Sequence, residues 1–391
     1  MILHSLRHQA NRLASSNSFD ERARLSLEHS SLGLTRREFL KVGGMAAAAM
    51  NIAVPLGGAA EVVSPALGKL SEYMSRAGDQ ALPAEVMDAT KQHILDTVAA
   101  MVSGAALPPG RVGLRFARAH AGEKIATVVG SKVLCGPLEA SLVNGMLAHS
   151  DETDDSHAAS HTHPGCAVVP AALAAGEQFG ITGLRFVRTV ALGYDIGTRV
   201  MMTLGGLPFQ METHRSAHSI GGVFGAAAAA GCAAGLNAQQ MRWLLDYAAQ
   251  QASGIAAWQR DTEHVEKSLV FGGMPARNGV SAALLIQLGG TGVDDIFTGA
   301  DNFLLAFAPK ADPSSLTDKI GERYEVTRTT FKKWTVGSPI QAPLDALQLL
   351  MKKRNFNSDQ VQKVIVRIAT SEAKTVNNRD IPAICGGDAD R

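Results

Sequence analysis

The sequence predicts a mainly α fold, in which an all-helical domain over residues 61–308 is followed by a smaller, incomplete α+β domain over residues 309–391. Two observations carry this prediction. Apolar residues recur at helical spacing through most of the first region, whereas segments rich in β-branched residues appear only after Pro309. Alanine and glycine are frequent on the expected helices, which favours close contact between helix backbones.

The first expected helix begins at Pro83, a residue suited to the first helical turn, and continues through Val86 and Ile94 to Gly104. One strand is expected in this region, at residues 125–130, where apolar and polar residues alternate. The remaining helices are expected at residues 138–149, 167–179, 184–202, 222–234, 238–253 and 276–288.

In the second region, residues 324–333 and 361–370 are expected to be strands, because both segments are rich in β-branched residues. A helix is expected between them at residues 343–353. Runs of strand and helix in this order are typical of a small α+β unit. A functional site is expected between the two domains, where ligand pockets are frequent.

The composition is that of a globular protein and excludes several classes. Of 391 residues, 46% are hydrophobic and 19% are charged, and the formal net charge is +1. There is therefore no basic field for nucleic acid. No apolar run reaches the roughly 18–20 residues of a membrane span without interruption, so no membrane helix is expected in the mature protein. The four cysteines form no C-x-x-C pair, which leaves a zinc knuckle or a thioredoxin motif unsupported.

Residues 1–60 are expected to be an export signal rather than part of the fold. Thr35-Arg-Arg-Glu-Phe-Leu-Lys41 precedes a weakly apolar stretch and then small residues at 57–60. This order is typical of a twin-arginine leader, which predicts export through the twin-arginine machinery to the periplasm. The alternative is an ordinary basic amphipathic helix at the N-terminus.

Acids and histidines are concentrated in one short segment between two expected helices. Residues 149–163 contain four carboxylates and four imidazoles, namely Asp151, Glu152, Asp154, Asp155, His149, His157, His161 and His163. Gathering so many titratable groups is unfavourable through repulsion and desolvation, and such groups are typical of functional sites. The segment is therefore the predicted site of chemistry.

Five blocks, in order along the chain, resemble those of the MmgE/PrpD family, which contains 2-methylcitrate dehydratase, cis-aconitate decarboxylase and iminodisuccinate epimerase. The resemblance runs from about residue 72 to residue 377. It implies a helical domain with an α+β lid, a homodimer, no metal or organic cofactor, and a small polycarboxylate substrate. The blocks are Leu95-Asp-Thr97, residues 143–149, the acidic run ending at His163-Pro-Gly165, Gly221-Gly-Val-Phe-Gly-Ala-Ala227 and Gly273-Met-Pro-Ala-Arg-Asn-Gly279.

The resemblance also implies roles for single residues. The family's Asp-x-Asp-Asp-Thr turn corresponds to residues 152–156, so that the leading acid here is Glu152 and the hydroxyl is Ser156, with Asp154 between them. The family's histidine before proline corresponds to His163. The other correspondences are approximate: His214 and His218 lie on either side of a second family histidine, and Lys267 is one residue from the family's lysine.

The chain departs from the family at the lid. The lid histidine of the family corresponds here to Gln341. A glutamine orients a carboxylate by hydrogen bonding but does not transfer a proton at neutral pH. The chain also stops at Arg391, where family members continue, so the lid domain is expected to be incomplete.

These residues predict a lyase that works without a cofactor. Removal of a proton next to a carboxylate requires a base near neutral pKa and cations that hold the substrate. We expect His163 to be the general acid/base, with His157, His161 and His218 as further candidates and Glu152, Asp154 and Ser156 around them. Lys267, His214 and Gln341 are the expected ligands of substrate carboxylates, and dehydration is the favoured reaction.

Other interpretations stay open at this point. Asp154 and Ser156 are also typical of helix caps or turns, and Lys267 of a charged surface. His157, His161 and His163 together offer ligands for zinc or manganese, which would make the enzyme metal-dependent. A third interpretation is a non-catalytic carboxylate-binding protein of the periplasm, which the glutamine at position 341 and the early stop favour.

Overall fold

The computed structural model describes residues 63–308, 311–368 and 370. The expected signal region, and with it the twin-arginine motif, lies outside these residues. The described chain is mainly helical, as predicted. Its helices are α4 (Pro65–Arg76), α5 (Ala84–Gly104), α6 (Pro108–Ala119), α7 (Pro137–Ala148), α8 (Gly165–Phe179), α9 (Gly183–Leu204), α10 (Leu207–Thr213), α11 (Ala217–Ala233), α12 (Ala238–Gln250), α13 (Val265–Ser268), α14 (Met274–Gln287), α15 (Phe303–Phe307) and α16 (Ser338–Arg354).

Shorter elements lie between these helices. The strands of the described residues are β1 (Ala126–Thr127) and β2 (Leu134–Cys135), which pair in antiparallel fashion. A π-helical turn at Leu269–Gly273 joins α13 to α14. Single 3-10 turns occur at Ala256–Arg260, Pro313–Leu316, Glu325–Arg328 and Ser358–Gln360.

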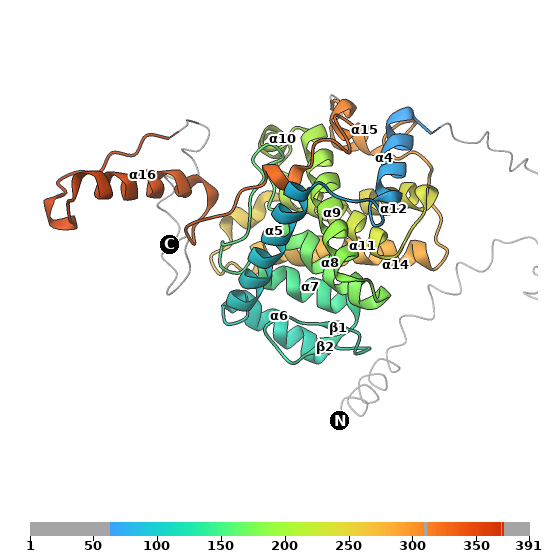
Figure 1. Ribbon diagram of the computed structural model, residues 1–391, viewed down its shortest axis with the longest axis horizontal. Coiled ribbons are helices and arrows are strands. Elements are labelled where there is room, and N and C mark those ends of the chain that lie inside the picture. Colours follow the sequence, from blue (N-terminus) through green and yellow to red (C-terminus); the bar gives the residue numbers. More distant parts are fainter. Residues whose placement is uncertain (1–62, 309–310, 369, 371–391) are drawn as a thin grey trace, which may run out of the picture. The chain divides into compact units, whose positions relative to one another are not determined.

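Helix α11 is the centre of the core, and Figure 1 shows it surrounded by the other helices. It packs against α9, α14 and α8, and every one of its residues is buried. Glycines allow this packing, as the sequence predicted. A Cβ atom at Gly197 of α9 would lie 2.5 Å from the carbonyl oxygen of Gly221 in α11, so the two backbones touch where a side chain would not fit.

A second close approach lies next to the histidine-rich loop. A Cβ atom at either Gly145 of α7 or Gly272 of the π-helical turn would collide with the backbone of the other. Gly272 thus allows close packing of the two backbones. The contact fixes the π-helical turn, and with it Phe271, against the end of α7.

Side-chain caps explain where several helices begin. Ser64, Thr182, Ser216 and Asn237 lie at the N-caps of α4, α9, α11 and α12, and each accepts a hydrogen bond from the first turn. The start of α11 was expected at residue 222. The helix begins five residues earlier, directly after its N-cap Ser216. The earlier start puts His218 in the first turn of this helix.

One helical run, Val265–Gln287, is by length and composition long and apolar enough to cross a membrane. It comprises α13, the π-helical turn and α14. More than half of its most apolar stretch is buried inside the protein, where it packs against α11, α7 and α8. That environment is typical of a core helix.

The expected strand at residues 324–333 is wrong. Residues 325–328 form a 3-10 turn, and Thr330 alone makes a strand-like bridge, with Ser156. The β-branched Val326 is buried against the helices instead of in a sheet. The second expected strand is not present in the described part of residues 361–370, whereas the helix expected at 343–353 is present as α16.

The helical packing continues beyond residue 308. Leu316 and Ile320 join the same apolar core as α11, and Tyr324 and Val326 join the core beside α7. Arg199 of α9 holds the intervening chain by donating to the carbonyl oxygens of Asp318 and Arg323, at 2.7 and 2.9 Å. The division into two domains at residue 308 stays a prediction.

Candidate active site

The loop between α7 and α8 contains the histidine-rich run. Its backbone adopts the left-handed conformation at Glu152 and His161, with φ of 58° and 54°. Such a conformation costs about 1–3 kcal/mol in a residue other than glycine and is frequent at functional sites. His264, before α13, has the same conformation. All three residues lie at the site described below.

A backbone bridge brings a distant segment beside this loop. Ser156 N donates to Thr330 O, and Thr330 N donates to Ser156 O, both at 2.9 Å. Lys332 follows two residues later and is 2% exposed. The bridge therefore places Lys332 beside the acids of the loop. This lysine was not among the site residues predicted from the sequence.

Glu152 is a buried carboxylate held by two lysines. Its Oε2 lies 3.1 Å from Lys332 Nζ, and its Oε1 pairs with Lys267 Nζ. Burial opposes ionisation of Glu152, but the charges of Lys267 and Lys332 outweigh it and hold the pKa of the carboxyl well below its ordinary value. Glu152 is therefore an anion at neutral pH.

Asp154 shares one of these cations. Its Oδ1 lies 3.2 Å from Lys332 Nζ, and its Oδ2 lies 2.8 Å from His149 Nδ1. Burial opposes ionisation here too, yet His149 and Lys332 hold the pKa of Asp154 below its ordinary value. For Lys332, burial is outweighed by the two carboxylates, which raise its pKa. Lys332 is thus a fixed cation rather than a base.

His163 lies at the edge of this charged group. Its Nδ1 is 2.5 Å from the carbonyl oxygen of Asp155 and 3.6 Å from Asp154 Oδ2, and its side chain is 9% exposed. Burial lowers the pKa of His163 to about 4, although Asp154 acts in the opposite direction. The imidazole is therefore neutral at pH 7. Because its Nδ1 faces a carbonyl oxygen, Nδ1 must carry the proton, and the lone pair lies on Nε2.

Two more histidines continue from His163. The ring of His218 stacks on Phe271, with centroids 3.9 Å apart, and lies 4.9 Å from the ring of His163. The ring centroid of His161 lies 5.0 Å from that of His218. Burial lowers the pKa of both His218 and His161, so these imidazoles are also neutral at pH 7. Phe271 belongs to the π-helical turn, and its ring contacts the rings of both His218 and His163.

His149 and His264 both lie close to Glu152 Oε1. His149 caps the C-terminus of α7, is fully buried and stacks on Phe271 with centroids 4.4 Å apart. His264 Nε2 lies 3.0 Å from the carbonyl oxygen of His149 and 3.5 Å from Glu152 Oε1. We call the whole group the acid–imidazole cluster. It consists of His149, Glu152, Asp154, His161, His163, His218, His264, Lys267 and Lys332.

Two predicted site residues of the same loop are directed elsewhere. His157 Nε2 lies 3.2 Å from Glu325 Oε2, and its Nδ1 lies 2.8 Å from Ser160 Oγ. His157 therefore joins the loop to the 3-10 turn at residue 325. Ser156 contributes its backbone to the bridge with Thr330, and its hydroxyl accepts a hydrogen bond from Ser338.

Two further predicted ligands are not part of the cluster. His214 is exposed and ends α10 in a left-handed conformation. The side chain of Gln341 donates to the carbonyl oxygens of Trp334 and Val336 and accepts from the amides of Lys333 and Trp334. The Gln341 side chain thus stabilises the backbone of residues 333–336. It would have to break these hydrogen bonds to bind a substrate.

The residues that sequence reasoning missed come from distant parts of the chain. Lys332 follows a phenylalanine in a segment without helical periodicity, and His264 stands among charged residues that resemble a surface cluster. Neither position carries a local signal. His93 on α5, which lies beside Asp155, is likewise a single histidine within a long helix.

Comparison with known protein families identifies the family of the chain. The family model of the MmgE/PrpD N-terminal domain matches residues 68–316. The chain belongs to the MmgE/PrpD family. The match includes His163, His218 and Lys267, whereas Lys332 lies beyond it. Both the predicted family and the mainly α fold are confirmed.

Named relatives of this MmgE/PrpD chain are fungal proteins. It is 26% identical to the cis-aconitate decarboxylase-like protein oryM of Aspergillus oryzae, over 80% of this chain and 67% of the relative. It is 22% identical to a cis-aconitate decarboxylase of Aspergillus terreus, over 78% of this chain and 64% of the relative. The chain thus matches about two thirds of the length of each relative.

The metal-binding interpretation meets a different set of ligands in this MmgE/PrpD chain. His157 faces Glu325, so the expected trio of His157, His161 and His163 is not brought together. Among the residues that the structure describes, two other groups have donor atoms within 4.8 Å of one another: His149, Glu152 and His264, and His149, Asp154 and Cys166. Their carboxylates are already neutralised by lysines, with which a metal ion would have to compete. The donor set does not favour a metal.

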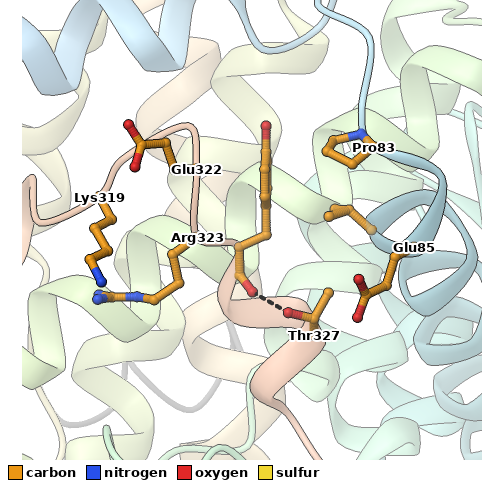
Figure 2. Close-up of a pocket in the computed structure, with 8 residues that line it drawn as sticks. Pro83, Glu85, Lys319, Glu322, Arg323 and Thr327 are labelled. Atoms are coloured by element: carbon orange, nitrogen blue, oxygen red, sulfur yellow. Dashed lines mark hydrogen bonds between the residues drawn. The ribbon is translucent and has the colours of Figure 1, made fainter.

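A surface pocket of about 480 Å³ lies elsewhere, between the start of α5 and residues 319–327 (Figure 2). No residue of the acid–imidazole cluster lines it. Figure 2 shows both charge signs in its wall, with Glu85 and Glu322 as well as Lys319 and Arg323. Charged side chains and a volume of this size are compatible with a small ligand. We place the site at the cluster instead, because the bases and paired charges that chemistry requires are there.

The neutral imidazoles predict a loss of stability in mild acid. His163 has a pKa of about 4 in the folded chain and an ordinary value of 6.5. Between these pH values the unfolded chain binds a proton at His163 that the folded chain excludes. The contribution of neutral His163 to the free energy of unfolding is therefore fully present above pH 6.5 and is lost as the pH falls to about 4. Because a tenfold difference in proton affinity is ~1.4 kcal/mol, His163 contributes about 3 kcal/mol to this loss.

Urea unfolding at intervals from pH 7.5 to 4.5 measures this effect. The free energy of unfolding is expected to fall with pH, and His161 and His218 add to the loss because their pKa values are lowered in the same direction. The variant His163→Asn has no imidazole at this position and should show a shallower fall. An equally steep fall in the variant would contradict a buried neutral His163.

Proposed function

We propose that this chain is a lyase that acts on a small di- or tricarboxylate without a cofactor, and that His163 moves the proton. One observation supports this most. His163 is neutral at pH 7 because burial lowers its pKa to about 4, and among the described residues its Nε2 has no hydrogen-bond partner, since Nδ1 alone is engaged. A neutral imidazole with a free lone pair is suited to abstract a proton.

The lysines support a polycarboxylate as the substrate. Lys267 and Lys332 lie on the same carboxylate, Glu152, so two positive charges stand close together. A substrate with two or more carboxylates would share these ammonium groups with Glu152 and Asp154. Its negative charge would also raise the pKa of His163, which stabilises the imidazolium that forms when the proton is taken.

The proposed step balances as follows. In dehydration, His163 Nε2 takes a proton from the carbon next to a carboxylate, the electron pair of the C–H bond forms the double bond, and hydroxide leaves. The hydroxide takes a proton from the imidazolium that has formed at His163, so that water leaves and the imidazole becomes neutral again. In decarboxylation, the C–C bond to a carboxylate breaks instead, carbon dioxide leaves, and the electron pair stays on the carbon. His163 takes a proton from solvent and passes it to that carbon.

Both reactions move a proton through His163, but the observations that favour each reaction differ. Dehydration is the reaction expected from the sequence, whereas the names of the relatives favour decarboxylation of a tricarboxylate. The products distinguish the two reactions. We therefore state the proposal at the level of a lyase for small polycarboxylates.

Incubation of the purified full chain with 2-methylcitrate, citrate and cis-aconitate tests the proposal. We expect consumption of at least one of them, followed by NMR, with an unsaturated acid or carbon dioxide as the product. Activity should be unchanged after dialysis against EDTA. Absence of turnover with all three acids, or its loss on metal removal, would overturn the proposal.

A second candidate function, non-catalytic carboxylate binding, is favoured by one observation. Gln341 stands where the family's lid histidine is expected, and its side chain is engaged within residues 333–336. Calorimetric titration of the same three acids separates the candidates. Tight binding without turnover would support a binding protein.

Export to the periplasm and assembly as a homodimer remain predictions. Export rests on the twin-arginine motif at residues 35–41, outside the described residues. The homodimer rests on the family resemblance.

A further inference from the structure

Asp155 differs from the other buried acids of the loop in its partners. Among the described residues, no lysine or arginine pairs with it. Its Oδ2 accepts a hydrogen bond from the hydroxyl of Tyr194 at 2.5 Å and lies 2.8 Å from Nδ1 of His93. Its Oδ1 accepts from the backbone amide of Gly165 at 3.0 Å. The carboxylate thus connects the loop to α9, α5 and the start of α8.

The backbone of the same residue contacts His163. The carbonyl oxygen of Asp155 lies 2.5 Å from His163 Nδ1, so Asp155 is joined to the chain on both sides of Pro164, by its carbonyl to residue 163 and by its carboxylate to residue 165. A carbonyl oxygen only accepts hydrogen bonds. The contact therefore requires the proton of neutral His163 on Nδ1.

Gly165 shows how closely these groups pack. A Cβ atom there would lie 2.7 Å from Thr97 Oγ1, 2.8 Å from the Tyr194 hydroxyl and 3.0 Å from Asp155 Oδ1. Any larger residue would push the carboxylate away from the start of α8. The position of Asp155 is therefore fixed by packing as well as by hydrogen bonds.

Tyr194 is suited to hold this carboxylate permanently. It is fully buried in α9. Burial, together with the nearby charge of Asp155, raises the pKa of Tyr194 well above its ordinary value. Tyr194 thus keeps its proton throughout the neutral range and remains a donor.

We propose that Asp155 is a positioning residue, which fixes the orientation and the Nδ1–H tautomer of His163 through its carbonyl oxygen while Tyr194 and Gly165 hold its carboxylate. Asp155 does not touch the substrate. The inference rests on the proposed function only where activity is concerned, because the tautomer itself is a property of the free protein.

The tautomer is measured by NMR of the full chain labelled with ¹⁵N at histidine. The signals of His163 are assigned by their loss in His163→Asn. We expect a protonated Nδ1 and an unprotonated Nε2 in the wild type. A proton on Nε2 in the wild type would overturn the inference, whatever the activity of the protein.

Two variants test the role of the carboxylate. Asp155→Asn replaces one acceptor oxygen by an amide, and Tyr194→Phe removes only the hydroxyl, so it is the milder change if the first does not fold. Both are expected to place part of the His163 population in the Nε2–H form. In an active protein, kcat should fall about 10- to 100-fold, as for other small misplacements of a reacting group, while KM changes little.

Tyr247→Phe is the matched control. Tyr247 donates one hydrogen bond to the carbonyl oxygen of Thr291, outside the cluster, and its loss should change neither the tautomer nor kcat. A pure Nδ1–H tautomer and wild-type kcat in folded Asp155→Asn or Tyr194→Phe would contradict the positioning role. If the wild type has the expected tautomer but no turnover with any acid, the proposed function fails and this inference stands.

Discussion

Replacement of Lys332 by methionine is expected to lower the free energy of unfolding by about 3–5 kcal/mol, the usual effect of removing one partner from a buried ion pair. Lys332 is 2% exposed and lies 3.1 Å from Glu152 and 3.2 Å from Asp154. Methionine retains the apolar stem but leaves these two buried carboxylates with less positive charge. Urea unfolding at pH 7 measures the loss.

The neighbouring lysine provides the control for this prediction. Lys333 pairs with Asp345 at 2.6 Å, and both side chains are about half exposed. Lys333→Met should therefore change the free energy of unfolding by less than about 1 kcal/mol. Adding Asp154→Asn to Lys332→Met should recover part of the stability, because Asp154 loses its lysine in Lys332→Met whereas Glu152 keeps Lys267. Equal effects of the two lysine variants would refute the role assigned to Lys332.

Replacement of His163 by asparagine is expected to reduce kcat by about 10²- to 10⁴-fold, the usual contribution of a general acid/base. The amide of asparagine can still donate to the carbonyl oxygen of Asp155, but it offers no base in place of Nε2. The loss should therefore appear in kcat more than in KM, which steady-state kinetics with the consumed acid would show.

Two other histidines of the prediction are the controls for His163. His214 is exposed, and His214→Asn should leave kcat within about twofold of the wild type. His157 faces Glu325 and Ser160, so His157→Asn is expected to reduce stability before it changes the chemistry. A loss of kcat in His214→Asn as large as in His163→Asn would show that the wrong histidines have been placed in the cluster.

The sequence allowed the helical framework and the centre of the site to be predicted, because both depend on local patterns. Capping residues and apolar periodicity indicate where α5, α7 and α9 lie. The concentration of acids and histidines indicates the loop after α7, and His163 was assigned through its place before Pro164.

The rest of the site depends on contacts between distant residues. Lys332 reaches Glu152 only because Ser156 and Thr330 form a backbone bridge, and no local pattern predicts which residues will pair in this way. The orientation of the His157 side chain follows from the turn that pairs residues 157 and 162. In this turn the backbone of His161 has the left-handed conformation. Spacing along the sequence suggested that His157, His161 and His163 would converge, but this turn separates His157 from the others.

The expected strand at residues 324–333 shows the same limit. β-branched residues are typical of strands, but they also suit any tightly packed apolar contact. Val326 is fully buried among helices, and the 3-10 turn around it directs Glu325 toward His157 and Arg323. Hydrogen bonds from His157 and Arg323 then outweigh burial and lower the pKa of Glu325 to about 2. Tertiary packing has overridden the local preference here.

Exchange of substrate hydrogen with solvent tests the central claim most directly, because it reports proton transfer even when no product accumulates. The acid that the wild type binds is incubated in heavy water, and deuterium at the carbon next to its carboxylate is followed by NMR. We predict that the wild type introduces deuterium at this carbon and that folded His163→Asn does not. Exchange at the same rate in both proteins would contradict a mechanism in which His163 moves the proton.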